Sequence, residues 1–279
     1  MIEELYYHDV INPNITAATI GVSKNKWVAI KDSEIDGNNY LTIMQENRFN
    51  ILPIISSDGQ AYEYFRSVSL NDYSAATREI ITYKDTITLD TSIKELIFKF
   101  GYMSKSHFFL TLNGKVSGLV SLSNLNTRSA QVYIFSLVCE LERTLSEFIQ
   151  DNIEEGVLLE NLKEKAKYDN KIRSLVKNYN KLLSEDYENS ITESLYFRQF
   201  FEIIKEFNLH LILGYTSNEE WEELYSMNKL RNSVAHPSKS LINKDQNIEF
   251  IQSKLEQIDD LLFRLRHQKN PNMSKSVLC

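Results

Sequence analysis

The sequence contains little cysteine, glycine or proline, and it has no long hydrophobic run. Its only cysteines, Cys139 and Cys279, lie far apart, which argues against a disulfide framework or a thiolate metal site and favours reduced thiols. A domain of many short strands uses more turn residues than 8 glycines and 4 prolines, so we expect long helices in much of the chain. No window approaches the roughly 18 apolar residues of a membrane span.

Charge and composition narrow the class of protein further. The net charge is −7, with 31 Lys+Arg against 38 Asp+Glu, which argues against coating of DNA but allows a local basic patch. The first ten residues lack the apolar core of a secretory signal, so a soluble, cytoplasmic protein without membrane contact is expected. The 42% hydrophobic content excludes global disorder, and 279 residues suffice for two domains.

The first part of the chain, residues 1–125, alternates short β-type runs with short helical stretches. Asp58-Gly59 and Asn113-Gly114 lie between apolar runs and predict two hairpins, since such turns need residues that tolerate positive φ. The turns are 55 residues apart, which predicts an internal repeat of β-α-β-β order. The predicted strands are 27–30, 51–55, 61–65, 108–112 and 115–121, and the predicted helices are 39–48 and 93–100.

The second part, residues 126–279, has helical periodicity, so the predicted fold class is α+β with a helical bundle at the C-terminal end. Apolar residues recur at helical spacing along three stretches, 134–148, 196–211 and 248–265. A charged helix over 158–183 and a helix from 218 to about 235 are also expected. The junction 123–129 contains no glycine or proline, which indicates a stiff connection between the domains 1–125 and 126–279.

The N-terminal repeats resemble the tandem CBS-domain family. The second repeat carries the resemblance best, in residues 81–96 and 112–125. In that family the clefts of the pair commonly hold adenosine-type nucleotides. A G-h-h-T-x-x-D stretch there supplies a hydroxyl near the phosphates and an acid for the ribose. Gly118, Ser121 and Asn124 occupy these places here; serine keeps the hydroxyl, whereas asparagine keeps an acceptor but loses the charge.

The first repeat departs from this pattern, since Glu63, Arg66 and Ser69 stand at the matching positions. A guanidinium at position 66 can still grip a phosphate through two parallel hydrogen bonds. The resemblance therefore implies a regulatory nucleotide, and the alternative is a domain that only dimerises the chain. A phosphate-binding loop and a dinucleotide fingerprint are both lacking. The candidate ligand-binding residues are Arg66, Thr82, Ser121 and Asn124.

The sharpest motif of the second part is Leu230-Arg231-Asn232-Ser233-Val234-Ala235-His236-Pro237. It resembles the R-x4–6-H signature of HEPN domains, helical bundles of which many are metal-independent endoribonucleases. The resemblance covers about residues 127–267 and implies that Arg231, Asn232 and His236 are catalytic. It also implies a homodimer, because in this family two motifs usually meet across a two-fold axis. No cofactor or metal is then required for catalysis.

The chemistry of RNA cleavage suits these residue types. The ribose 2′-OH attacks the adjacent phosphate, and a histidine that titrates near pH 7 can accept or donate the proton. An arginine stabilises the charge on the phosphorane, and Asn232 can donate a further hydrogen bond. Residues five apart on a helix differ by about 140° in azimuth, so Arg231 and His236 do not share one helix face. We expect the helix to end near His236, because proline disfavours helical backbone at the residue before it.

Other interpretations of these residues remain open. Arg231 can pair with a glutamate such as Glu222 or Glu223, and His236 can cap the helix end. Glu140 and Glu142 either orient the motif or, as we expect, face water. Seven basic residues between 163 and 181 either track a phosphate backbone or, more simply, form an ion-paired helix face. His8, His107 and His210 show no metal-ligand spacing.

Together the two resemblances predict a nucleotide-regulated endoribonuclease that acts on RNA in stress or antiphage defence. The competing hypothesis is a non-catalytic adaptor or nucleotide sensor that oligomerises and binds a partner.

Overall fold

The computed structural model describes residues 15–69, 72–185, 187, 190–236, 238–244 and 246–269. The chain divides into two compact units. The N-terminal unit contains the described residues up to Tyr133 together with Ser240–Glu249, and the C-terminal unit contains Ile134–Lys239 together with the chain from Phe250 onward. Both division points that follow Tyr133 and Glu249 fall inside helices.

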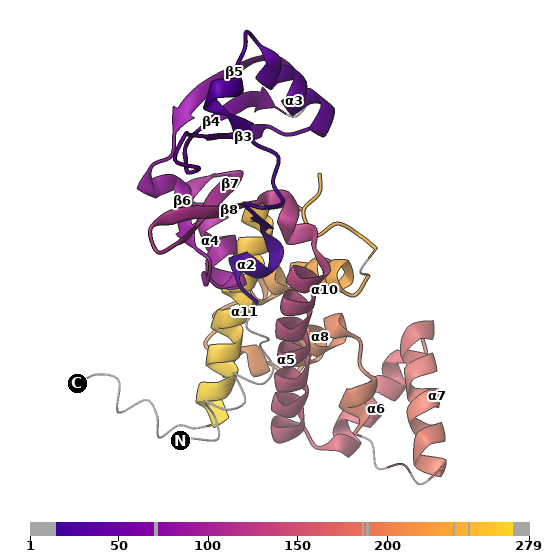
Figure 1. The fold of residues 1–279 in the computed structure, drawn as a ribbon. Coiled ribbons are helices and arrows are strands. Elements are labelled where there is room, and N and C mark those ends of the chain that lie inside the picture. Colours follow the sequence, from indigo (N-terminus) through magenta and orange to yellow (C-terminus); the bar gives the residue numbers. More distant parts are fainter. Residues whose placement is uncertain are drawn as a thin grey trace, which may run out of the picture. The chain divides into compact units, whose positions relative to one another are not determined.

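The N-terminal unit holds two four-stranded sheets with matching topology (Figure 1). In each sheet a parallel pair continues into two antiparallel neighbours, in the orders β6-β7-β8-β1 and β2-β3-β4-β5. The strands are β1 (Val22–Ser23), β2 (Ile30–Lys31), β3 (Ile51–Ile55), β4 (Ala61–Ser69), β5 (Asp72–Ile80), β6 (Thr86–Thr88), β7 (His107–Leu112) and β8 (Lys115–Ser121).

The predicted β-α-β-β order occurs twice. Helix α3 (Asn39–Asn47) precedes the hairpin β3–β4, and α4 (Ile93–Met103) precedes the hairpin β7–β8. The short helix α2 (Ala17–Ile20) lies before β1. Both hairpin turns are those expected from the sequence: Gly59 has φ 76°, and Asn113 and Gly114 have φ 50° and 73°. These residue types adopt left-handed backbone at little cost, so the two turns could be predicted from the sequence.

Several features of this unit differ from the prediction, among them the short strands β1 and β6, which were not predicted. The strand expected over 27–30 begins only at Ile30, because the amides of Lys26 and Trp27 both donate to the Ser23 carbonyl and close a turn. Strand β5 was not predicted at all. Its sequence contains a run of small and polar residues, and its side chains are mostly exposed, so the alternation that reveals a half-buried strand is missing.

The core of the unit joins its two sheets. Ile51 and Tyr64 from one sheet pack with Phe109 from the other, and all three side chains are buried. A second cluster holds α3 on its sheet, where the Tyr40 ring stacks on Phe65 with the centroids 3.9 Å apart. The contact through Phe109 places the ends of β4, β5 and β7 close to one another.

A segment from late in the chain completes the N-terminal unit. The Ile242 amide donates to Asn126 Oδ1 over 2.7 Å, and Asn126 Nδ2 donates back to the Ile242 carbonyl over 3.3 Å. Leu241 beside it is fully buried. Residues 240–249 are therefore part of this unit, although more than a hundred residues separate them from the rest of it.

The C-terminal unit is helical, as the periodicity predicts. The apolar residues expected on the first and third stripes are all buried, on α5 and α11 respectively. The helices are α5 (Arg128–Asn152), α6 (Glu155–Lys165), α7 (Asn170–Ser184), α8 (Phe197–Glu206), α9 (Asn218–Glu222), α10 (Met227–Val234) and α11 (Ile248–Lys269). Helices α5 and α11 each begin in the N-terminal unit.

Three predicted helix extents were wrong. The charged helix over 158–183 is two helices, because Asp169 caps a new start by accepting hydrogen bonds from the Lys171 and Ile172 amides. The stripe over 196–211 is helical only to Glu206, and left-handed backbone at Asn208 (φ 57°) follows. The helix expected from 218 is interrupted by a 3-10 turn at residues 223–226. No described helix is long and apolar enough to cross a membrane.

Candidate functional site

Helix α10 presents the R-x4-H residues at its C-terminal end. Met227, Leu230 and Val234 bury one face of the helix, which fixes its rotation and leaves Arg231 half-buried beside that face. The helix ends at Val234, two residues before His236. Asn232 and His236 are exposed. Within the part of the chain that the structure describes, neither of these two side chains has a hydrogen-bond partner. Pro237, on which the expected helix end rests, lies outside the described residues.

Arg231 is anchored by an acid from another helix. Its Nε donates to Glu142 Oε1 over 3.2 Å, with 36% of the arginine side chain and 27% of the glutamate side chain exposed. The expected partners Glu222 and Glu223 are not the ones used; Glu222 pairs with Lys205 instead. The expectation that Glu142 faces water was wrong, because α5 directs it at the motif. Glu142 thus binds the Nε edge of the Arg231 guanidinium. The two Nη groups make no hydrogen bond among the described residues.

Glu140 also has partners rather than facing water. It binds Arg143 over 2.8 Å and Arg266 over 3.0 Å, and only 10% of its side chain is exposed. Burial disfavours its charged form, but the hydrogen bonds from Arg143 and Arg266 outweigh this and lower the pKa of Glu140. Glu140 therefore links α5 to α11 through Arg266, whereas Glu142 binds Arg231 of the R-x4-H motif.

The basic stretch on α6 and α7 is largely neutralised. Lys163, Lys165, Lys167 and Lys181 each pair with a glutamate. This pattern favours the ion-paired helix face over a phosphate-binding track.

The four predicted ligand-binding residues lie in the N-terminal unit: Arg66 within β4, Ser121 at the end of β8, and Thr82 and Asn124 in the segments that follow β5 and β8. Ser121 ends β8, and its amide and hydroxyl both donate to Asn124 Oδ1, over 2.7 and 2.9 Å. Thr82 follows β5 in the same geometry, since its amide and hydroxyl donate to Asp85 Oδ2 over 2.9 and 2.5 Å. Each pair caps a short 3-10 turn. The unit therefore contains two T-x-x-D-like caps.

Strand register relates the two repeats. Arg66 pairs with Ile51 at the start of β3, and Ser121 pairs with His107 at the start of β7. Arg66 thus occupies the position in the first repeat that Ser121 occupies in the second, in agreement with the matching of the two repeats by sequence. The T-x-x-D cap of the first repeat lies later, at Thr82–Asp85, because β5 is inserted between. Sequence reasoning missed Asp85 for that reason, although the letters Thr-Tyr-Lys-Asp were its signal.

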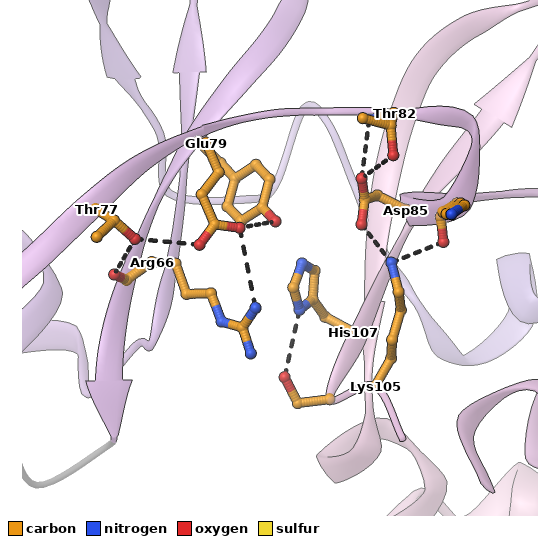
Figure 2. A network of polar contacts seen from close by, with 10 residues as sticks. Arg66, Thr77, Glu79, Thr82, Asp85, Lys105 and His107 are labelled. Atoms are coloured by element: carbon orange, nitrogen blue, oxygen red, sulfur yellow. Dashed lines mark hydrogen bonds and ion pairs between the residues drawn. The ribbon is translucent and has the colours of Figure 1, made fainter. Parts of the chain in front are cut away.

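Arg66 belongs to a polar network that surrounds a buried histidine (Figure 2). Its Nη1 lies 3.9 Å from Glu79 Oε2, and its side chain is half exposed. The Tyr64 hydroxyl donates to the same Glu79 oxygen over 2.6 Å, and Thr77 donates to the other over 3.1 Å. Burial and the hydrogen bond to Glu79 raise the pKa of Tyr64, so its phenol remains a donor at neutral pH. Glu79 is thus fixed, while Arg66 is only loosely paired.

Lys105 and Asp85 form a tighter ion pair on the other side of the network. The Lys105 ammonium donates to Asp85 Oδ1 and, over 2.7 Å, to the Lys84 carbonyl. Their side chains are 22% and 14% exposed. Burial disfavours the Asp85 carboxylate, but the hydrogen bonds from Lys105 and Thr82 outweigh it and lower the pKa of Asp85. The Asp85 carboxyl is therefore ionised near neutral pH.

His107 lies between these two ion pairs (Figure 2) and is 4% exposed. Its Nδ1 lies 3.3 Å from Ser106 Oγ, and its buried Nε2 has no hydrogen-bond partner in the described structure. Burial, together with the positive charges of Arg66 and Lys105, lowers the pKa of His107 to about 4. The imidazole is neutral at pH 7. Sequence reasoning missed this residue, because nothing local distinguishes a network histidine from a core one.

No group of three or more His, Cys, Asp or Glu side chains among the described residues is arranged to hold a metal ion. His8 and Cys279 lie outside the described residues.

Comparisons with known proteins give little further guidance. No family model matches the chain, and no curated protein matches it. An uncharacterized conserved protein from Pyrococcus horikoshii is 18% identical, with 40% of this chain and 89% of that one covered and a TM-score of 0.31. A CBS-domain containing protein from Agrobacterium tumefaciens is 12% identical, with 38% and 82% covered and a TM-score of 0.27. Likeness at this level carries no argument, so the two family resemblances rest on the residues themselves.

Proposed function

We propose that this protein is a nucleotide-regulated, metal-independent endoribonuclease. The C-terminal unit cuts RNA with Arg231, Asn232 and His236, and the N-terminal unit binds an adenosine-type nucleotide. One observation carries the proposal: Glu142 anchors Arg231, while Asn232 and His236 stay exposed at the same helix end. A phosphodiester can approach these groups without any rearrangement of the helix.

Each residue has a separate task in the cleavage. The ribose 2′-OH attacks the adjacent phosphorus, His236 exchanges a proton with the attacking or leaving oxygen, and the free Nη groups of Arg231 bind the phosphorane oxygens. Asn232 donates to a further oxygen. The leaving group departs as a 5′-OH, and the other product carries a 2′,3′-cyclic phosphate. DNA lacks the nucleophile and is not cut.

We place the active site between two copies of the chain. Arg231 lies on the helix and His236 lies beyond its end, and a second motif supplies the second acid–base group that general acid–base cleavage uses. Each copy then contributes one arginine and one histidine to a shared site.

The polar network around His107 and the two turn caps of the N-terminal unit support the regulatory part of the proposal. Asp85 and Asn124 offer oxygen acceptors for ribose hydroxyls, and Arg66 and Lys105 offer cations for a phosphate. A nucleotide bound there shifts the balance between two arrangements of the dimer. Helices α5 and α11, which begin in the N-terminal unit and continue into the C-terminal one, are the connections that carry this shift. A sensor joined to a self-toxic nuclease fits a role in stress or antiphage defence.

Cleavage of a labelled RNA by the pure protein, with EDTA present and with or without a nucleotide panel, tests the proposal. We expect cutting in EDTA, a cyclic phosphate on the product, and a rate that one nucleotide changes. His236→Ala should lower the rate by a factor of at least about 100, the usual contribution of a general acid or base.

His267→Ala is the matched control. This histidine also lies in the C-terminal unit, but it is only partly exposed and its ring packs against Phe263 of α11. It should leave the rate unchanged. Full activity in His236→Ala removes the histidine from the mechanism, and activity lost in EDTA removes the metal-free chemistry.

A non-catalytic nucleotide sensor is the second candidate. The ion pair between Arg231 and Glu142 favours it, because a purely structural arginine makes the same contact. This candidate predicts nucleotide binding by the wild-type protein and no RNA cleavage under any condition of the panel.

A further inference from the structure

The groups of the N-terminal network that would hold a nucleotide are already bound to one another. Lys105 holds Asp85 Oδ1, and Thr82 holds the other oxygen through its amide and hydroxyl. The Lys105 ammonium also donates to the Lys84 carbonyl. An incoming ribose hydroxyl therefore meets a carboxylate whose two oxygens both already accept hydrogen bonds, and an incoming phosphate meets an ammonium that already has an anion.

Separating Lys105 from Asp85 leaves two unpaired charges on side chains that are mostly buried. The side chains of Lys105 and Asp85 are 22% and 14% exposed, so neither is well solvated by water where it lies. Breaking a largely buried pair by engaging only one partner leaves the other charge uncompensated, which is strongly unfavourable. A ligand that offers only a phosphate binds Lys105 and leaves the Asp85 carboxylate without a cation. A ligand that offers only hydroxyls binds Asp85 and leaves the Lys105 ammonium without an anion.

We propose that the Lys105–Asp85 pair is a selectivity device that opens by exchange and admits only ligands carrying both a phosphate and a ribose diol. On binding, the ammonium moves from Asp85 to the ligand phosphate, and the freed carboxylate accepts the ribose hydroxyls. Phosphorylated ribosides then bind, whereas nucleosides and inorganic phosphate do not. This inference rests on the proposed nucleotide site and makes Lys105 a specificity-determining residue.

His107 indicates where the phosphate lies. When the Ser106 hydroxyl donates to Nδ1, the neutral ring carries its proton on Nε2, which is buried and has no acceptor among the described residues. Figure 2 shows the ring between the Arg66–Glu79 pair and the Lys105–Asp85 pair. An anionic oxygen brought in between them satisfies this donor and neutralises both cations. A buried donor in need of an acceptor is costly, so its satisfaction adds to the exchange.

Calorimetric titration of the full-length protein with AMP, ATP, adenosine and inorganic phosphate tests the exchange. We expect the wild type to bind AMP or ATP at least 100-fold more tightly than adenosine or phosphate. In Lys105→Met, Asp85 is free for the diol but the phosphate has lost its cation. The preference for nucleotide over adenosine should therefore fall at least tenfold.

Lys84→Met is the matched control. Lys84 is adjacent to Asp85 in the chain and exposed, it lies over the Tyr83 ring, and no described carboxylate pairs with it. Its substitution should leave the nucleotide preference unchanged. A second variant, Asp85→Asn, keeps the side-chain shape and releases Lys105, so its affinity for inorganic phosphate should rise at least tenfold. Circular dichroism and thermal melting establish that each variant is folded.

The outcomes separate the two claims. If no nucleotide binds to the wild type, the proposed nucleotide site is wrong and the inference falls with it. If a nucleotide binds but Lys105→Met keeps the wild-type preference, or Asp85→Asn gains no phosphate affinity, the site stands and the exchange is overturned.

Discussion

At the residue scale, burial determines the protonation state of His107 in the N-terminal unit. His107 is enclosed by Tyr64 and Phe109, whose ring centroids lie 5.4 and 5.6 Å from its own. It is also close to the charges of Arg66, Glu79, Asp85 and Lys105. The two carboxylates favour its protonation, but burial and the two cations outweigh them. The imidazole therefore contributes to folding only in its neutral form.

This predicts that the unit loses stability in weak acid. The pKa of His107 falls from an unfolded value near 6.5 to about 4 on folding, so the unfolded chain binds the proton more readily between these values. Stability is fully present above pH 6.5 and is lost as the pH falls towards 4, by about 3 kcal/mol in all. Urea unfolding followed at pH 7 and pH 4.5 measures this loss.

His107→Leu, which fills the site without a titrating group, should show a smaller loss over this pH range than the wild type. The control His267→Ala should keep the wild-type pH dependence, because that histidine lies in the C-terminal unit, outside the network around His107. An unchanged pH dependence in His107→Leu would mean that other groups cause the acid sensitivity.

At the element scale, the short strand β1 depends on two close backbone approaches. A Cβ added at Gly118 on β8 would meet the Val22 carbonyl oxygen at 2.7 Å, and one added at Gly21 would meet Leu110 Cδ1 at 2.6 Å. Gly118 pairs directly with Ser23. The glycine that the family pattern places next to the ligand thus has a packing role in this chain.

Gly118→Ala should destabilise the protein by about 1–3 kcal/mol, the usual cost of overpacking. Gly156→Ala is the control: nothing lies within 4 Å of its added Cβ, and it stands in the first turn of α6, so it should be neutral or stabilising by up to about 1 kcal/mol. Thermal and urea unfolding of both variants measure the difference. Equal stability of Gly118→Ala and Gly156→Ala would show that β1 can move away from β8 without loss of stability.

The elements also show how far the sequence alone can lead. Hairpins with Asp-Gly or Asn-Gly turns and helices with long apolar stripes were predictable, because their signals are local. Strand β5 was not, since most of its residues are polar and exposed and only Tyr73 and Ala76 pack against the core, which gives no alternating pattern. The candidate site divides in the same way. Arg66 and Thr82 were named from the family resemblance. Asp85, Lys105 and His107 come together through the pairing of β6 with β7, and Arg66 joins them only where the two sheets meet.

At the scale of the whole molecule, the proposed nuclease needs two copies of the chain. The described residues of one copy bring Arg231 together with Glu142 but give His236 no partner at all. A site built from two motifs contains two arginines and two histidines. A mixed dimer that lacks one arginine and one histidine keeps one of each in the shared site, whereas each single variant loses both copies of one residue.

Mixed single variants should therefore complement each other. Arg231→Ala and His236→Ala should each be inactive alone. When the two are co-expressed and purified as a mixed dimer, RNA cleavage should recover to at least tenfold above either variant, as measured with the labelled RNA in EDTA. A mixed dimer as inactive as its parents would mean that each copy works with its own arginine and histidine. Co-expression of Arg231→Ala with itself serves as the control.

The return of residues 240–249 to the N-terminal unit sets an order on events during synthesis. When residue 133 leaves the ribosome, Leu241 and the hydrogen-bond partner of Asn126 at Ile242 have not yet been made. The first unit to emerge is thus not the first to be finished, and most of the C-terminal unit has been translated before the N-terminal unit is complete. A nascent chain cannot hold a completed regulatory unit without also carrying the residues 231–236 that it is proposed to control.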